Sequence, residues 1–483
     1  NYEIQKSGSH TSTGIFYPTE DSIDDHKGYS VKQFGGCGNQ WANQTMFFTK
    51  NELENRPWIA NGLKWEISYN ELNIYYKKIL KLLFNNTTGT QPECLPNTKD
   101  YNESYFDNVF LKNGIFDFPN SYHPKKVEKF NYKSEFSKKI INSKNVKIFI
   151  NFTATNFTFN ENKKSILNVE IKSKKKTLNI KSKIFILCAG GLENPRILLN
   201  NIKNNSFLKN DLIGKYFMEH PLTKIGTIYL KKKISLSMLL GIFKKNYHYR
   251  KGIRFTDDFQ KQKKILNSHI FINPIFEENN YTKIRENIKA LLKIKKLPYL
   301  FLKNFNINAL LENIYFSPKK NSNFYLNNLI RLYFKKIKYN FKFIKLDVIY
   351  HGEQSPNILS KVYLNNTTDS NGLNNMNIEW KLNDQDYNTI NLFKKYLKNN
   401  SSDFFIFTED NNSTIKGQSH KTGTTRMGGN KLDGVVDKNC KVFDIDNLYV
   451  SGSSIFRTSG SSNPGITEMA ISLRLAEYIS HLL

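Results

Sequence analysis

An uninterrupted apolar run at residues 184–188 leads directly into the small residues Ala189, Gly190 and Gly191, and an apolar helical stretch over 197–199 follows. A continuous apolar run of this length is typical of a strand that is covered on both faces. A strand, a small-residue turn and a helix in this order are the unit by which an α/β sheet presents a ligand at the carboxyl ends of its strands. The segment therefore predicts a parallel sheet with a ligand site close to Ala189 and Gly190.

Other segments predict a mixed fold. Residues 166–171 and 177–180 flank a polar turn and predict a β-hairpin. Short strands at 347–350, 361–364 and 377–382 favour an antiparallel sheet. We therefore expect a mixed α/β and α+β fold, in which an incomplete Rossmann-like domain is interleaved with a second domain built on an antiparallel sheet flanked by helices.

Helices are expected at three places. Ser68 and Glu71 form a capping-box pattern ahead of an amphipathic stretch. Residues 384–397 and 467–482 also show helical periodicity.

A length of 483 residues indicates two domains or one large composite domain. The expected divisions are residues 1–221, the mainly antiparallel segment 222–383, and residues 384–483, which return to the first domain.

The formal net charge of +29 allows a polyanion partner. However, the lysines are scattered among Asn, Ile, Phe and Tyr in short runs, which favours compositional bias on a solvated surface, so no specific nucleic-acid partner is predicted. The four cysteines are widely spaced without a Cys-x-x-Cys pair, which predicts a reducing, cytoplasmic location and no metal site. No apolar run is long enough to span a bilayer.

His420 is the leading candidate for chemistry. It lies among Ser419, Thr422 and Gly423, small and polar residues that allow a loop to present the imidazole, which can accept a proton near neutral pH. Asn463 precedes Pro464 at the start of the last predicted helix. Its structural interpretation is a helix N-cap, and its functional interpretation is an amide that orients a substrate hydroxyl beside His420.

The order of motifs resembles the glucose–methanol–choline (GMC) family of FAD-dependent oxidoreductases. The matching segments are 35–41, 189–196, 214–221, 353–356, 420–428, 435–437, 447–450 and 462–464. The resemblance implies oxidation of a CH–OH group in a small alcohol, polyol or sugar. His420 would be the base that takes the hydroxyl proton, Asn463 its hydrogen-bonding partner, and the flavin N5 the acceptor of hydride. No motif identifies the electron acceptor that reoxidises the flavin.

The resemblance also implies the residues that contact FAD. Some family members attach FAD covalently through a histidine near the first glycine-rich segment, and since this sequence has none between His26 and His123, non-covalent FAD is expected. The implied cofactor-binding residues are Gly35, Gly36, Asn39, Ala154, Ala189, Gly190, Gly452, Ser453 and Pro464.

One family element is absent from the sequence. No Gly-x-Gly-x-x-Gly turn is present, although the family opens with one to bind the FAD pyrophosphate. Because the chain begins with Asn1, we expect this βαβ unit to lie upstream in a longer protein, and the chain by itself to bind FAD weakly. The alternative is a non-catalytic interaction protein that keeps the fold without the cofactor.

Overall fold

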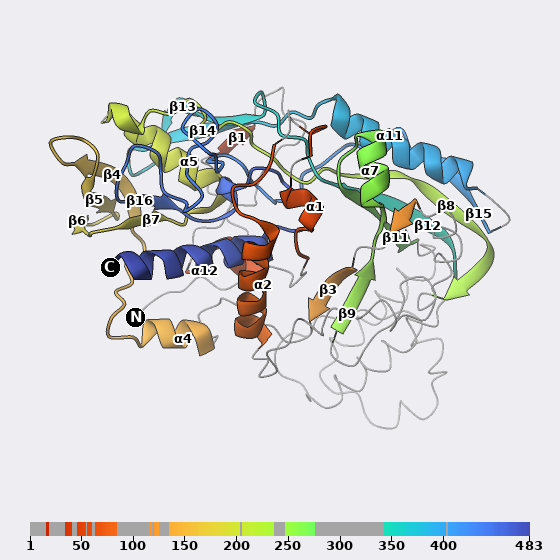
Figure 1. Ribbon diagram of the computed structural model, residues 1–483, viewed down its shortest axis with the longest axis horizontal. Helices are drawn as coiled ribbons and strands as arrows, with labels where there is room; N and C mark the ends of the chain where they lie inside the picture. The colour runs from red at the N-terminus through yellow and green to blue at the C-terminus, as the bar shows by residue number, and fades with distance from the viewer. Residues whose placement is uncertain are drawn as a thin grey trace, which may run out of the picture.

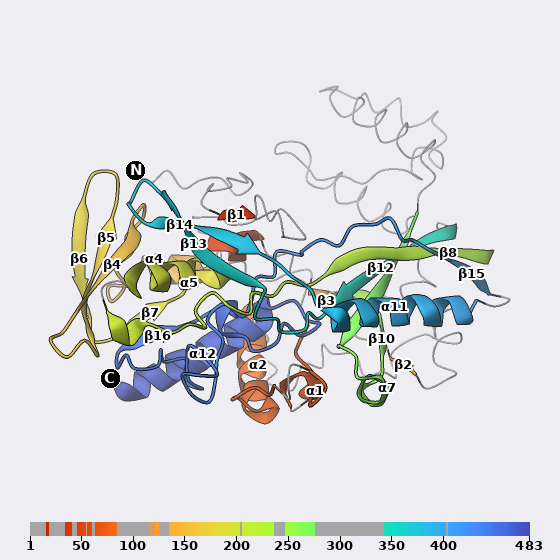
Figure 2. The ribbon, with the colours of Figure 1, turned by 90° about the horizontal axis from the view of Figure 1, so that it is seen from above.

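The computed structural model describes residues 16–18, 34–40, 46–54, 56–59, 63–84, 115–117, 120–124, 135–202, 205–235, 247–275, 342–401 and 404–483. Figures 1 and 2 show that these residues form an elongated molecule with two bodies side by side along its long axis. Parts of the expected domains 1–221 and 222–383 lie outside the described residues.

The first body is built around two helices and two small sheets. The long C-terminal helix α12 (Gly465–Leu482) packs on α2 (Tyr69–Phe84), and the two helices cross in Figure 1. Strands β7 (Phe185–Leu187) and β16 (Leu448–Val450) pair in parallel. Strands β4 (Thr153–Phe159), β5 (Ile166–Lys172) and β6 (Thr177–Lys181) form an antiparallel sheet at the end of the molecule.

Helix α5 (Gly190–Asn201) connects these elements to a further small sheet. Its side chains pack against the hairpin of β13 (Lys361–Thr368) and β14 (Asn374–Glu379), and β1 (Phe16–Pro18) pairs with β14 in parallel. Arg196 on α5 is fully buried and donates to the Asn374 and Leu373 carbonyls and to Asp369 Oδ2, which is 2.9 Å away. This hairpin therefore belongs to the α5 side of the molecule.

The second body is a six-stranded sheet whose neighbours pair antiparallel. Its spatial order is β15 (Phe405–Glu409), β8 (Leu222–Ser235), β12 (Lys342–Gly352), β11 (Ser268–Pro274), β10 (Ile253–Phe255) and β2 (Phe116–Asp117). Helices α11 (Asp384–Asn399) and α7 (Asp257–Lys263) contribute side chains such as Phe393 and Phe259 to its apolar core. The other described elements are η1 (Gly36–Gln40), α1 (Lys50–Leu53), β3 (Asn120–Pro124), β9 (Tyr247–Lys251), α4 (Glu135–Ile141), η5 (Ser206–Leu208) and η7 (Ser453–Ile455).

Several local predictions are confirmed. The hairpin of β5 and β6 lies at the expected residues. The Glu71 N–H donates to Ser68 Oγ at 3.2 Å at the start of α2, and Leu72 and Tyr76 on its apolar face are buried. Helix α11 begins at Asp384 as expected, with Asn383 as its capping residue. The mixed fold class, with antiparallel sheets flanked by helices, is also confirmed.

Two local predictions are wrong. β7 is not covered on both faces, because Ile186 remains 42% exposed. Asn463 is not the N-cap of α12: the helix begins at Gly465, Pro464 already has helical backbone angles, and no side chain caps this end. Since Pro464 lacks an N–H group, it removes one of the donors that a cap would satisfy.

The domain boundaries stay a prediction. β8 begins at Leu222, the predicted boundary, and carries the second body. The expected middle segment also contains β13 and β14, and these lie against α5 rather than in the six-stranded sheet. Among the described residues, no helix has both the length and the apolar character needed to cross a membrane.

A buried ion pair joins an N-terminal segment to the end of β12. The Arg56 guanidinium contacts both carboxylate oxygens of Glu353, at 2.7 and 2.5 Å, and both side chains are almost fully buried. The same carboxylate accepts from the Asn267 N–H at 3.0 Å. Such a pair fixes the relative position of these segments, because either charge alone would be strongly disfavoured in the interior.

Arg56→Ala should therefore lower the free energy of unfolding by about 3–5 kcal/mol, since it leaves the Glu353 carboxylate buried without its counter-charge. The paired replacement Arg56→Met with Glu353→Leu removes both charges and should cost clearly less. Urea unfolding followed by circular dichroism measures both variants. If Arg56→Ala were as stable as the wild type, the ion pair would not hold these segments together.

Candidate active site

Three segments that are distant in the sequence meet beside the carboxyl end of β7. Thr424 Oγ1 donates to the Gly191 carbonyl at 2.6 Å, and Ser453 Oγ donates to the Lys421 carbonyl at 2.8 Å. The Gly423 N–H donates to the Ser453 carbonyl at 3.2 Å. The turn before α5, the loop that carries His420 and the turn at Gly452 are thus fixed against one another.

Glycine stands at three positions of this junction for different physical reasons. A Cβ on Gly191 would lie 2.3 Å from the Lys421 carbonyl oxygen, so only glycine allows the two backbones this approach. Gly452 has φ of 110°, a conformation that other residues rarely adopt. A Cβ on Gly190, whose φ is 81°, would meet no atom within 4 Å. The backbone at Gly190 therefore borders open space, whereas the backbone at Gly191 is packed against Lys421.

The predicted cofactor residues Ala189, Gly190, Gly452 and Ser453 are brought together. Ala189 is exposed, and its N–H donates to Asn194 Oδ1 at 2.7 Å. The Cβ position of Gly452 lies 3.8 Å from Gly190 Cα. An open, glycine-containing backbone surface at the end of a strand suits the close approach of a large planar or phosphate-bearing cofactor.

The remaining predicted cofactor residues lie in separate elements. Gly35 and Gly36 both have positive φ, of 85° and 51°, in the turn at the start of η1, to which Asn39 also belongs. Ala154 is half-buried in β4 and packs at the edge of the large apolar cluster of the first body. Pro464 is buried immediately before α12.

His420 is fixed through its backbone by a buried carboxylate. Its N–H donates to Glu219 Oε2 at 2.7 Å. The Glu219 N–H in turn donates to Gln354 Oε1 at 2.8 Å, and the Trp380 indole N–H donates to the same oxygen at 2.7 Å. Glu219 and Gln354 have no solvent-exposed surface. The position of the His420 loop is thus determined by groups from three other segments.

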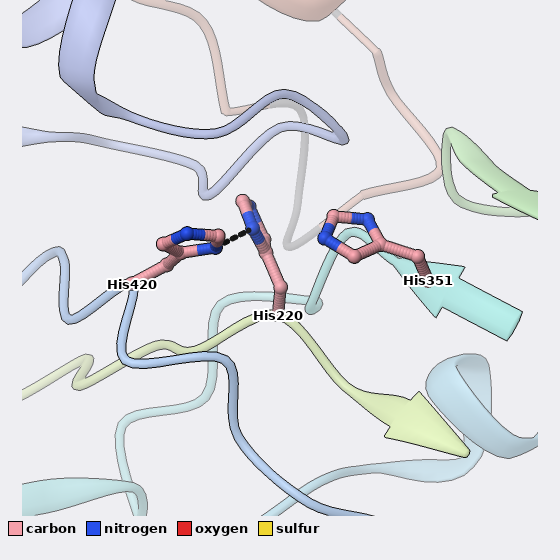
Figure 3. A group of neighbouring side chains, drawn as sticks. All are labelled: His220, His351 and His420. Atoms are coloured by element: carbon pink, nitrogen blue, oxygen red, sulfur yellow. Dashed lines mark hydrogen bonds between the residues drawn. The ribbon is translucent and has the colours of Figure 1, made fainter. Parts of the chain in front are cut away.

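The ring of His420 contacts a second histidine. Its Nδ1 lies 2.8 Å from Nδ1 of His220, as the dashed line in Figure 3 shows, and Nε2 of His220 lies 3.1 Å from the Ser459 carbonyl oxygen. Ser459 Oγ accepts from the Gln354 N–H at 2.8 Å. The hydrogen bonds therefore close a circuit through His420, Glu219, Gln354, Ser459 and His220.

Two further histidines extend the cluster. His351 of β12 lies with its ring centroid 4.9 Å from that of His220, and His269 of β11 stacks on His351 at 4.7 Å. One ring nitrogen each of His220, His351 and His420 lie within 4.8 Å of one another. Four of the nine histidines of the chain thus gather at this point, a convergence that the sequence does not reveal.

The environment keeps the two hydrogen-bonded imidazoles neutral. Burial lowers the pKa of His220 to about 4, and the hydrogen bond to the Ser459 carbonyl only partly opposes this shift. Burial is also the main cause that holds the pKa of His420 well below 6.5, and the neighbouring His220, were it protonated, and Lys421 lower it further. At neutral pH both rings are in the form that can accept a proton.

Asn463 lies on the loop that supplies Ser459. This loop is held by buried contacts: the Ser461 N–H donates to Glu52 Oε1 at 2.6 Å, and Ser462 Oγ donates to the Phe47 carbonyl at 2.7 Å. His420 and the loop of Asn463 are therefore connected through His220 and Ser459. The direct pairing of Asn463 with His420 stays a prediction.

The sequence did not assign roles to His220, His351, Glu219 or Gln354. Glu219 and His220 stand in the segment 214–221, and Gln354 in the segment 353–356, both of which were recognised only as family motifs. An acidic residue next to a histidine and a proline was the available signal. An open hollow of about 320 Å³ lies elsewhere, along Thr227, Tyr229 and residues 408–413, and includes none of the predicted site residues.

Comparison with known proteins gives two family matches. Residues 120–222 match the family model of the N-terminal domain of GMC oxidoreductases, and residues 356–472 match the model of their C-terminal domain. The chain is therefore similar to both domains of the GMC oxidoreductase family, in the order that the family has them. The two matches contain Ala189, Gly190 and His220 on one side, and His420, Gly452 and Asn463 on the other.

Two curated proteins are similar to this chain over short segments. Pyranose 2-oxidase from Lyophyllum shimeji is 41% identical over 64 residues, which are 13% of this chain and 10% of that protein. The 2-methyl-1,2-propanediol dehydrogenase of Mycolicibacterium austroafricanum is 41% identical over 61 residues, which are 13% of this chain and 11% of that protein. Each match spans about a tenth of the length of the relative concerned.

The fold of this chain is similar to that of solved structures over most of its length. A formate oxidase from Aspergillus oryzae RIB40, described for its FAD modification, aligns with a TM-score of 0.54 and 14% identity, covering 95% of this chain and 85% of that one. At this identity the likeness establishes the fold.

The neutral state of His220 should make stability depend on pH. Above about pH 6.5 the imidazole is neutral in both folded and unfolded chains. As the pH falls from 6.5 toward 4, only the unfolded chain takes up the proton, so stability is lost by roughly 3 kcal/mol from this group. Urea unfolding at pH 7 and pH 4.5 should show a smaller loss for His220→Asn, which cannot titrate. Equal losses in the variant and the wild type would contradict a buried neutral His220.

Proposed function

We propose that this protein is an FAD-dependent oxidoreductase that oxidises a CH–OH group. The observation that carries the proposal is the position of His420: a neutral imidazole, held by the circuit of hydrogen bonds, on the loop that packs against Gly191 and Ser453. The junction of turns offers open backbone for a cofactor, and the imidazole next to it offers a base. The matches to both GMC oxidoreductase family models support the combination.

His420 is the proposed general base. In its neutral form it accepts the hydroxyl proton of the substrate as the carbinol carbon is oxidised. Bound FAD supplies the acceptor for the hydride that leaves this carbon. Loss of the hydroxyl proton to His420 raises the electron density on the oxygen, which favours departure of the hydride. Asn463 is proposed to orient the same hydroxyl through its side-chain amide.

FAD is proposed to bind without a covalent bond along Ala189, Gly190, Gly452 and Ser453. These residues fit the cofactor because Ala189 is exposed and the turn at Gly190 is open, while Gly452, buried beside that turn, has no side chain to fill it. Gly35, Gly36, Asn39, Ala154 and Pro464 are proposed as further contacts. No covalent attachment is proposed, since the sequence has no histidine between His26 and His123, the region of the first glycine-rich segment.

The proposed substrate is a small alcohol with several hydroxyl groups, a polyol or a sugar. The relatives named for a pyranose and for a propanediol support this class.

His420→Ala should slow reduction of the bound flavin by roughly 10²–10⁴-fold, the usual contribution of a general base. Asn463→Ala should slow it less, by about the strength of one hydrogen bond, or roughly 10-fold. Anaerobic mixing with a panel of sugars and polyols, followed by flavin absorbance, measures both variants.

The matched control is His481→Ala, because His481 is exposed near the end of α12. This variant should reduce its flavin at the wild-type rate. Flavin absorbance after purification should be equal in all variants, since none removes a proposed contact to FAD. Reduction of His420→Ala at the wild-type rate would contradict the assignment of the base.

A further inference from the structure

The contacts of His220 determine where its protons lie. The Ser459 carbonyl oxygen can only accept a hydrogen bond, and His220 Nε2 lies 3.1 Å from it. This nitrogen must therefore carry a proton and donate. Since a neutral imidazole has one N–H, His220 Nδ1 then has a lone pair and can only accept.

The alternative protonation state of His220 is disfavoured by its surroundings. A proton on both nitrogens would place a positive charge on a side chain with no exposed surface. The low pKa of His220, about 4, expresses the same penalty. At neutral pH, His220 Nδ1 is therefore an acceptor that faces His420 Nδ1 at 2.8 Å.

We propose that His220 is a positioning residue, which holds His420 in the tautomer with its proton on Nδ1 and its Nε2 bare. This inference rests on the proposed function and deepens it. The hydrogen bond between the two Nδ1 atoms requires one donor and one acceptor, and His220 is the acceptor. His420 Nδ1 is the donor, and its Nε2 is the only nitrogen left to take a proton from a substrate.

The same hydrogen bond stabilises the product of proton transfer. When the hydroxyl proton moves to Nε2, His420 becomes an imidazolium whose Nδ1–H still donates to His220. The bond is then charge-assisted, and such bonds are stronger than neutral ones. The buried Glu219 carboxylate accepts from the His420 backbone N–H and lies 3.7 Å from the Lys421 ammonium, so it fixes the loop while its charge is offset by that lysine.

The tautomer can be observed without turnover. The whole protein, labelled with ¹⁵N-histidine, gives long-range ¹H–¹⁵N correlations that distinguish a protonated ring nitrogen from a bare one. The signals of His420 are those that disappear in His420→Gln. At pH 7 we expect a protonated Nδ1 and a bare Nε2 in His420, and the reverse in His220. A proton on His420 Nε2, or a doubly protonated His220, would overturn the proposal and leave the proposed function untouched.

Variants of His220 test the consequence for the reaction. Asn at position 220 places its amide oxygen near the position of His220 Nδ1 and so keeps a hydrogen-bond acceptor there. Ala at position 220 removes the acceptor. His220→Ala should slow flavin reduction by roughly 10- to 10²-fold, less than loss of the base itself, and should shift the His420 signals to a mixture of tautomers. His220→Asn should recover most of the rate and the wild-type tautomer, and His481→Ala should change neither. Equal rates for His220→Ala and His220→Asn would contradict the positioning role. If His220→Ala does not fold, the His420 tautomer in His220→Asn tests the proposal, and a tautomer other than that of the wild type would overturn it.

A metal ion is the competing explanation of the histidine cluster. An ion held by both Nδ1 atoms would displace the proton between them. Titration with Co²⁺, followed by visible absorption, should give no tetrahedral band at stoichiometric concentration. An intense band that is lost in His220→Ala and kept in His481→Ala would overturn the proposed hydrogen bond.

Discussion

The hydrogen-bonded contact between His220 and His420 depends on a circuit to which four distant segments contribute. Glu219 and His220 precede β8, Gln354 follows β12, His420 lies between β15 and β16, and Ser459 precedes α12. Each buried donor or acceptor left without its partner would cost about 1–3 kcal/mol. The arrangement is thus stable only when all four segments are in place, because displacing one leaves buried polar groups of the others unpaired. Such cooperativity is expected of a closed polar network in a low-dielectric interior.

The two bodies of the molecule meet at this circuit. Glu353, one residue before Gln354, pairs with Arg56 and fixes the end of β12. The Trp380 indole, fully buried after β14, shares the oxygen of Gln354 with Glu219. On the other side, Glu52 fixes the loop of Ser459 through the Ser461 N–H. The imidazole of His420 is therefore set between the six-stranded sheet and the α5 side of the molecule, next to the glycine turns that we propose to hold FAD.

Local signals in the sequence predicted much of the fold. The capping pattern at Ser68, the small residues after β7 and the apolar periodicity of α12 each act within one segment, and each led to the correct element. The glycines at positions 35, 190 and 452, which the resemblance implies as cofactor contacts, all have positive φ. The prediction failed where burial depends on distant chain: Ile186 is exposed because no described strand or helix covers that face of β7. The histidine cluster could not be predicted, since His220, His269 and His351 come from separate segments that only the antiparallel pairing of β8, β12 and β11 brings together.

The central claim is that His420 presents a bare ring nitrogen to a substrate hydroxyl beside a flavin. A crystal structure of the protein with FAD and a non-reactive polyol analogue tests it most directly. The account predicts the flavin against the turns at Gly190 and Gly452, with the analogue hydroxyl at hydrogen-bond distance, about 2.6–3.2 Å, from His420 Nε2. A flavin bound elsewhere would contradict the account. So would an analogue whose hydroxyl makes no hydrogen bond to a ring nitrogen of His420.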